Sequence, residues 1–184
     1  RVGFVSEKVK ELVAQSKKYF KNPLAEFVYY RSYARWIPEE GRRETWIETV
    51  DRYINFMREN VGSHITVSEY DEIREAILNQ EVMPSMRLLQ FAGKAARKTN
   101  ICAYNCSFIA PKSFQDFGEI MYISMCGTGV GWSVESENIQ ALPQIKKQLG
   151  KSLQNYVIPD SKEGWADAFV FGLKAWFEGK DVSF

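Results

Sequence analysis

The stretch that decides the fold of this chain runs from Met83 to Glu135. Residues 83–93 read MPSMRLLQFAG, residues 100–109 read NICAYNCSFI, and residues 126–135 read CGTGVGWSVE. In order, these segments predict a polar turn, a strand that carries a thiol, a helix, and a glycine-rich turn that opens a second strand. Small polar groups, a cysteine and flexible backbone rarely recur together in a segment that serves packing alone.

A βαβ unit is predicted inside this stretch. Residues 104–110 and 130–135 are strand-like, and a helix is expected over 114–125, with Ser113 as its N-cap and Asp116 at the third helical position. Two strands separated by a helix indicate parallel pairing, because a parallel pair needs a crossover connection. We therefore expect an α/β fold after the polar turn.

The chain before this stretch is predicted to be helical. Apolar residues recur at helical spacing over 6–20 and again over 46–57. A third helix is expected to begin near Ser68, with Asp71 as its capping partner. Its apolar side would bury Tyr70, Ile73 and Ile77.

A last helix is predicted to open at residues 160–163 and to end at Gly179. Residues 136–157 are polar and predict no element. The helix carries a wide apolar stripe, made of Trp165, Phe169, Leu173, Trp176 and Phe177. Such a stripe fits a core or a partner interface better than a cofactor site.

Composition excludes several classes of protein. The 184 residues are 45% hydrophobic and 26% charged, with 24 basic residues against 23 acidic ones, so bulk charge gives no reason to expect nucleic-acid binding. No apolar run long enough for a membrane helix and no signal-peptide pattern are visible, so we expect a cytoplasmic protein without a membrane partner. Three cysteines fit free thiols better than a disulfide framework.

Each residue that could carry chemistry also has a purely structural explanation. Cys102 and Cys106 have a spacing that suits metal, but the single histidine, His64, lies in a separate helical region, so no metal site is expected. Cys106 is either a reactive thiol or a buried packing residue. Residues 127–131 match neither a Walker loop nor a dinucleotide fingerprint, and they serve either close ligand approach or a tight turn. Ser85 is a phosphate contact or a turn residue.

Five segments together carry a family resemblance. They are YRSYARW at 30–36, GRRETW at 41–46, MPSMR at 83–87, NCSF at 105–108 and PDSKEGWAD at 159–167. In this order they resemble ribonucleotide reductases, most closely the monomeric-type adenosylcobalamin-dependent ribonucleoside-triphosphate reductases. The resemblance implies a helical region over 1–82, followed over 83–184 by the first strands of a ten-stranded α/β barrel and an effector- or partner-interface helix.

The resemblance also implies a mechanism and roles for residues. In the family, a thiyl radical removes the 3′ hydrogen of the ribose, and two cysteines reduce the 2′ carbon and become a disulfide. Cys106 matches one cysteine of that redox pair. Ser85 matches a position near the substrate phosphates, Cys126 and Gly127 match a turn whose backbone approaches the nucleotide, and Ser107 is an adjacent candidate.

Other parts of the family's machinery have no match in this sequence. The thiyl-forming cysteine and the second redox cysteine belong to later family segments, so we expect an N-terminal portion with an incomplete barrel, inactive without its C-terminal portion. Adenosylcobalamin would be bound mainly by that other portion. The implied partners are the C-terminal portion, a ribonucleotide, a deoxynucleotide effector and a thioredoxin-like reductant.

Two other functions stay open from the sequence. One is a non-catalytic module that binds nucleotide or a partner protein through the last helix and the glycine turn. The other is a helical interaction domain in which the thiols merely pack. The residues do not distinguish a diphosphate from a triphosphate substrate.

Overall fold

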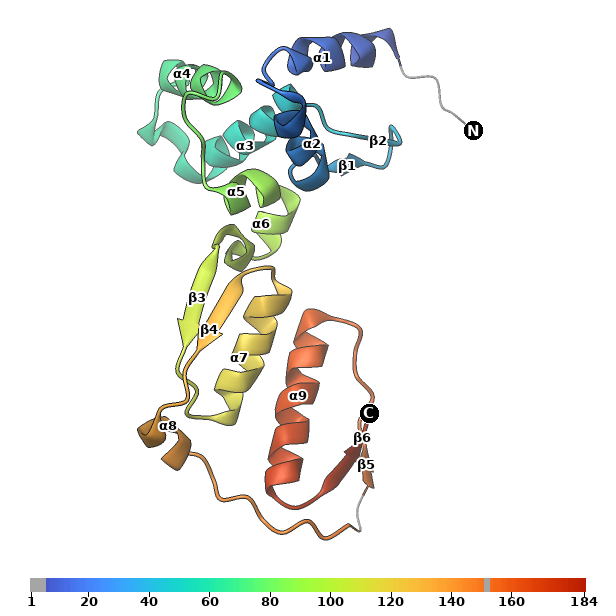
Figure 1. Ribbon diagram of the computed structural model, residues 1–184, viewed down its shortest axis with the longest axis vertical. Coiled ribbons are helices and arrows are strands. Elements are labelled where there is room, and N and C mark those ends of the chain that lie inside the picture. Colours follow the sequence, from blue (N-terminus) through green and yellow to red (C-terminus); the bar gives the residue numbers. More distant parts are fainter. Residues whose placement is uncertain (1–5, 151–152) are drawn as a thin grey trace. The chain divides into compact units, whose positions relative to one another are not determined.

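The computed structural model describes residues 6–150 and 153–184 (Figure 1). Contacts divide the chain into two compact units, one ending at Ala103 and the other running from Tyr104 to Phe184. Residues 83–103 therefore belong with the helical part of the chain. The assignment of residues 83–184 to a reductase barrel stays a prediction.

From residue 6 onward, where the structure describes it, the first unit is helical apart from one short hairpin. Its described elements are α1 (Glu7–Lys17), α2 (Pro23–Ser32), β1 (Trp36–Ile37), β2 (Arg42–Arg43), α3 (Trp46–Val61), α4 (Val67–Leu78), α5 (Met86–Phe91), α6 (Lys94–Lys98) and the 3₁₀ turns η1 (Gly62–His64) and η2 (Asn100–Ala103). The strands pair antiparallel, with Trp36 opposite Arg43. The helices predicted over 6–20 and 46–57 are confirmed as α1 and α3.

Helix α3 carries the core of the first unit, between α2 and α4 (Figure 1). Val50 is fully buried on this helix, and Trp46 and Ile54 are each 3% exposed. The Trp46 indole Nε1 donates to the carbonyl of Leu78 at 3.1 Å and joins α3 to the end of α4. Its ring meets that of Tyr29 edge-on at 5.4 Å, which joins α2 to the same core. Each such side chain contributes about 1.5–3 kcal/mol by burial.

The predicted start of the third helix is wrong by two residues. Helix α4 begins at Val67, and Thr66 is its N-cap, with a capping box in which the Thr66 N–H donates to the carboxylate of Glu69 at 2.7 Å. Ser68 and Asp71 have the same spacing, so spacing alone did not separate the two pairs. Of the expected core residues, Tyr70 and Ile77 are buried, whereas Ile73 is 36% exposed.

The polar turn at Met83–Ser85 leads into helix, and the expectation that it leads to the thiol-bearing strand is wrong. Helices α5 and α6 and the turn η2 lie between them. Residues 86–91 and 94–98 are rich in Leu, Gln, Ala, Lys and Arg, which have high helix propensity. The short apolar run of α5 had no clear period that could reveal this helix.

The second unit begins with the predicted βαβ arrangement. Its described elements are β3 (Cys106–Ile109), α7 (Phe114–Met125), β4 (Gly129–Trp132), α8 (Ser136–Gln140), β5 (Leu153–Asn155), α9 (Lys162–Phe177) and β6 (Asp181–Ser183). Strands β3 and β4 are parallel, as predicted, and α7 has the predicted bounds. Its capping box of Ser113 and Asp116 is confirmed. Strand β4 ends at Trp132, three residues earlier than predicted.

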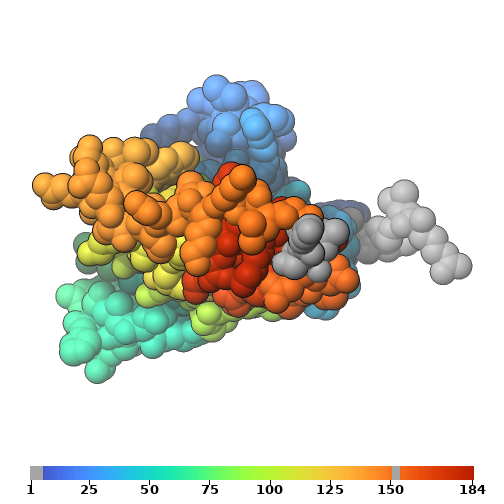
Figure 2. Space-filling view, turned by 90° about the horizontal axis from the view of Figure 1, so that it is seen from below, coloured from blue at the N-terminus to red at the C-terminus, as the bar shows by residue number. Residues whose placement is uncertain are grey.

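A second parallel pair follows that the sequence did not predict. Strands β5 and β6 flank α9, and Gln154 lies opposite Val182. Helices α7 and α9 lie side by side, with the Phe114 and Phe177 rings edge-on at 4.8 Å (Figure 1). The segment after α8 runs along the end of α9, where the Lys146 N–H donates to the Phe177 carbonyl at 2.8 Å; Figure 2 shows this orange segment beside the red helix.

The described strands form three two-stranded sheets, β1–β2, β3–β4 and β5–β6. The chain is thus a mixed helical and stranded protein, in which both sheets of the second unit are parallel pairs with a connecting helix. The ten-stranded barrel remains a prediction.

Candidate functional site

The candidate site lies at the edge where β3 and β4 begin. In the parallel register, Cys106 lies opposite Gly129. Two hydrogen bonds fix the segments that enter these strands: the Gly129 N–H donates to the Asn105 carbonyl at 3.0 Å, and the Thr128 hydroxyl donates to the Tyr104 carbonyl at 3.1 Å. Because parallel strands begin at the same edge of a sheet, the thiol-bearing strand and the glycine turn meet there.

Cys106 is the exposed thiol of this protein. Cys102 is 4% exposed and its Sγ donates to the carbonyl of Thr99 at 3.2 Å, and Cys126 is 6% exposed. The plain interpretation of Cys106 as a buried packing residue is therefore wrong. An exposed thiol can reach an external reductant, whereas a buried one cannot without opening of the fold.

The glycine turn ends α7 and starts β4. Cys126 is the C-cap of α7, and Gly127 adopts a φ of +96°, which a side chain would strain. The N–H of Cys126 donates to the Tyr122 carbonyl at 3.0 Å, and that of Gly127 donates to the Ser124 carbonyl at 3.0 Å. Both main-chain donors are thus used by the helix end. A ligand at this turn would meet carbonyl groups and the bare Cα of Gly127.

Ser107 is held within the sheet. Its hydroxyl donates to the carbonyl of Gly129 at 3.1 Å, which links β3 to β4 next to the thiol. The structure therefore brings Cys106, Ser107, Cys126 and Gly127 to one edge of one sheet. Ser107 supports the strand pairing there and does not present a free hydroxyl.

Ser85 belongs to the first unit, at the N-cap position of α5. It is exposed, and its side chain makes no capping hydrogen bond. Ser and Asn side chains at other helix starts do cap, as at Ser113 and Ser161 in the second unit. The Ser85 hydroxyl is thus not used to cap its own helix.

A cluster of functional groups from the start of α9 reaches the glycine turn. The ammonium Nζ of Lys162 lies 3.6 Å from the Sγ of Cys126 and 5.9 Å from the centre of the Tyr122 ring. The Tyr122 hydroxyl donates to the carboxylate of Glu163 at 3.3 Å. Partial burial, together with Cys126 and Glu163, raises the pKa of the Tyr122 phenol. Helix α9 therefore holds the turn in place through Lys162.

Lys162 and Glu163 lie in the family segment at 159–167, but the sequence assigned them no role in the site. Their contacts join residues that are 36 and 41 positions apart in the sequence. The local feature that would have drawn attention to them is the N-cap at Ser161, which places both side chains on the first turn of α9.

A groove of about 510 Å³ runs along α9 in the second unit. Its aromatic lining includes Trp165, Phe169, Trp176 and Phe184. Trp165 and Trp176 are 45% and 54% exposed, so the apolar stripe of α9 is open rather than a closed core. Lys180 and Asp181 are the charged residues at this groove.

The lining of the α9 groove does not suit a large polar cofactor. The α9 groove is lined almost entirely by apolar side chains, whereas a corrin ring with its amide side chains needs many hydrogen-bonding partners. Among the residues that the structure describes, no three His, Cys, Asp or Glu side chains gather as metal ligands. In the same part of the chain, no helix is long and apolar enough to cross a bilayer.

An exposed thiol beside a glycine turn, at the start of a parallel βαβ unit, defines an α/β protein with a candidate thiol-redox site. The comparisons with known proteins name the family. Residues 5–86 match the model of the ribonucleotide reductase alpha domain. This part of the chain, within the helical first unit, belongs to the ribonucleotide reductase alpha domain family.

Two curated relatives show the extent of the likeness. The adenosylcobalamin-dependent ribonucleoside-triphosphate reductase of Lactobacillus helveticus is 30% identical over 68% of this chain and 21% of the relative. A probable enzyme of the same name from Dictyostelium discoideum is 26% identical over 95% of the chain and 28% of the relative. The chain thus spans between 21% and 28% of the length of these relatives.

A solved structure shares the fold. The crystal structure of a B12-dependent class II ribonucleotide reductase covers 94% of this chain with a TM-score of 0.65 and 23% identity, and the match takes up 34% of that structure. At this identity the likeness concerns the fold alone.

Proposed function

We propose that this chain is the N-terminal part of an adenosylcobalamin-dependent ribonucleoside-triphosphate reductase and supplies one of its two redox cysteines. The observation that carries the proposal is the exposure of Cys106 at the first position of β3, while Cys102 and Cys126 are buried. Reduction of a substrate and renewal by an external thiol both require a redox cysteine that other molecules can reach.

In the proposed reaction, Cys106 and a second cysteine outside this chain provide two electrons and two protons. The 2′ hydroxyl of the ribonucleotide leaves as water, a C–H bond forms at the 2′ carbon, and the two sulfurs form a disulfide. A dithiol or a thioredoxin-like protein then reduces that disulfide by thiol exchange. Adenosylcobalamin supplies the radical chemistry and is bound mainly by the other portion of the enzyme.

The remaining site residues have supporting roles in the proposal. Ser85 offers an uncapped hydroxyl near the substrate phosphates, and the turn at Cys126 and Gly127 presents carbonyls and bare backbone beside the nucleotide. Ser107 and Lys162 hold the strand pair and the turn. From the resemblance to the reductase family, we also propose that the whole enzyme binds a deoxynucleotide effector and is cytoplasmic.

A second candidate function is a binding module without catalysis. The open aromatic groove on α9 favours it, because exposed apolar patches mark interaction sites. The two candidates differ at Cys106, since a binding module does not need that thiol.

The test is complementation. The purified chain, supplied with adenosylcobalamin, a dithiol and ATP, should form no deoxynucleotide until a C-terminal reductase portion with the two other cysteines is added. Reductase activity from the chain alone would contradict the division of the redox pair. Nucleotide binding that persists after Cys106→Ser, without activity in any combination, would favour the binding module.

A further inference from the structure

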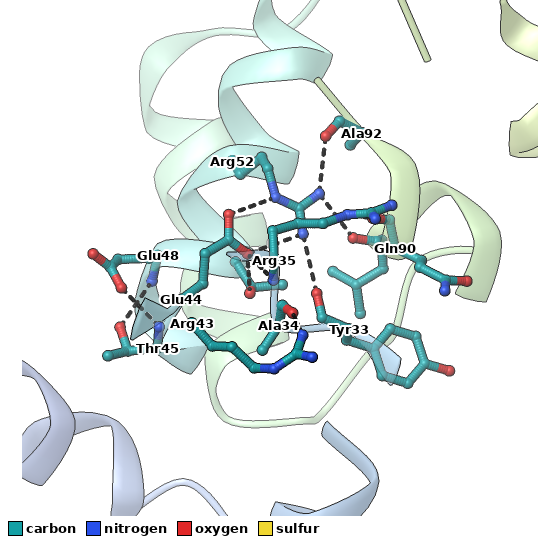
Figure 3. Close-up of polar contacts among 12 residues, drawn as sticks. Tyr33, Ala34, Arg35, Arg43, Glu44, Thr45, Glu48, Arg52, Gln90 and Ala92 are labelled. Carbon is teal, nitrogen blue, oxygen red and sulfur yellow. Dashed lines mark hydrogen bonds and ion pairs between the residues drawn. The ribbon is translucent and has the colours of Figure 1, made fainter. Parts of the chain in front are cut away.

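Two arginine side chains bind the carbonyls at the end of α5 (Figure 3). Arg52 Nη1 donates to the carbonyl of Leu89 at 3.1 Å and to that of Ala92 at 2.9 Å. Arg35 Nε donates to the carbonyl of Gln90 at 2.7 Å. The last carbonyls of a helix have no partner inside it, and a cation is favourable at that end. Helix α5 is therefore attached to the first unit through its main chain.

The guanidinium of Arg52 is fully used. Its Nε and Nη2 donate to the two carboxylate oxygens of Glu44 at 2.9 and 3.2 Å, and Nη2 also donates to the carbonyl of Tyr33 at 3.4 Å (Figure 3). Together with the two carbonyls at the end of α5, these acceptors match the five N–H donors of an arginine. A lysine carries three donors on a single nitrogen, so it cannot supply five donors or span the positions of these acceptors.

Glu44 is itself fixed by the core. It is 7% exposed and accepts hydrogen bonds from the Thr49 hydroxyl at 2.8 Å and from the main-chain N–H of Arg35 at 3.2 Å. Thr49 is fully buried and lies 2.7 Å from the hydroxyl of Tyr29, whose pKa is raised by burial. A continuous set of contacts thus leads from α2 and α3 to the end of α5.

The opposite end of α5 carries Ser85. The helix has six residues and a length of about 9 Å, so holding its C-terminal end also sets the position of its first turn. Leu89, 1% exposed, anchors the middle of the helix in the core. The exposed Ser85 turn is thus the free end of an element fixed from the other side.

We propose that Arg52, held by Glu44, is a positioning residue that fixes α5 and so presents Ser85 to the substrate phosphates. The inference rests on the proposed function, in which Ser85 contacts those phosphates. Arg52 acts through the main chain of α5 and does not touch the nucleotide.

The test compares Arg52→Lys with Arg58→Lys in the reductase assembled from this chain and its C-terminal portion. Arg58 lies on the same helix, in an ion pair with Asp71 whose two side chains are 41% and 64% exposed, and is the matched control. For Arg52→Lys we expect the KM for ATP as substrate to rise roughly tenfold, kcat to change little, and amide exchange of residues 86–92 to accelerate. Arg58→Lys should change neither. A folded Arg52→Lys enzyme with unchanged KM and exchange overturns the inference.

Two further variants keep the test decisive. If Arg52→Lys does not fold, Arg35→Lys, which loses the Nε contact to Gln90, should still accelerate exchange at the end of α5, and unchanged exchange overturns the inference. Ser85→Ala should raise KM without changing exchange. If Ser85→Ala raises KM and Arg52→Lys does not, the positioning role of Arg52 is refuted while the phosphate role of Ser85 stands. If Ser85→Ala leaves KM unchanged, the phosphate role fails and this inference with it.

Discussion

Cys106 lies directly opposite Gly129 in the parallel register of β3 and β4. Directly opposite residues of a strand pair share one face of the sheet, so the neighbour of the thiol on this face has no side chain. A Cβ at position 129 would lie 3.3 Å from the Asn105 carbonyl oxygen, closer than an ordinary contact. Glycine therefore permits the close strand start and leaves the thiol open.

Alkylation of the native chain should begin at Cys106. We expect iodoacetamide to modify it at least about tenfold faster than Cys102 or Cys126, because both of those thiols are buried. Mass spectrometry of the peptides gives the three rates. In denaturant the three rates should converge; a native chain in which Cys102 reacts as fast as Cys106 would contradict the exposure argument.

Gly118→Ala should destabilise the second unit. A Cβ at position 118 of α7 would lie 2.5 Å from Cγ2 of Val170 on α9. Overpacking costs about 1–3 kcal/mol, and the better helix propensity of alanine offsets about 1 kcal/mol of it. We expect a net loss of about 1 kcal/mol in the free energy of unfolding, measured with urea.

Gly131→Ala is the control for that variant. A Cβ there would lie 3.5 Å from Cδ2 of Phe108, an ordinary contact. We expect a change within about 0.5 kcal/mol. Equal losses for the two glycines would mean that α7 and α9 do not pack through Gly118.

Asp116 should make the stability of the second unit sensitive to acid. The main-chain N–H of Lys112, at 2.9 Å, and the N–H and hydroxyl of Ser113 hold the pKa of this carboxyl below its ordinary value. A lowered pKa gives stability that is present above the ordinary pKa and is lost as pH falls through the lowered one. Between about pH 5 and about pH 2, the free energy of unfolding should therefore fall less in Asp116→Asn than in the natural chain. Parallel pH curves would show that the capping carboxylate does not contribute.

Local sequence patterns predicted the elements that are defined by residues close together in the sequence. The Ser113 box, the α7 bounds and the parallel strands on either side follow from caps and from strand–helix–strand order. Thr66 and Ser68 each have an acidic residue three positions later, so this spacing alone did not identify Thr66 as the N-cap of α4. Strands β5 and β6 are short and gave no period-two signal.

The long-range polar contacts were not predictable in this way. Arg52 binds carbonyls 37 and 40 residues later, and a main-chain carbonyl has no residue type to mark it. The contact of Lys162 with Cys126 likewise depends on how α7 and α9 pack. The exposure of Cys106 was open as well, because periodicity places it on a face of the strand without saying whether that face is covered.

The role of Cys106 as a redox cysteine is tested most directly by multiple-turnover deoxynucleotide formation in the complemented enzyme, with a dithiol as reductant. Cys106→Ser should abolish repeated turnover, because serine cannot form or exchange a disulfide. Cys102→Ser should keep most of the activity, because the Cys102 thiol is buried and donates a hydrogen bond to the Thr99 carbonyl. Repeated turnover by Cys106→Ser at the natural rate, or equal losses for the two variants, would contradict the assignment.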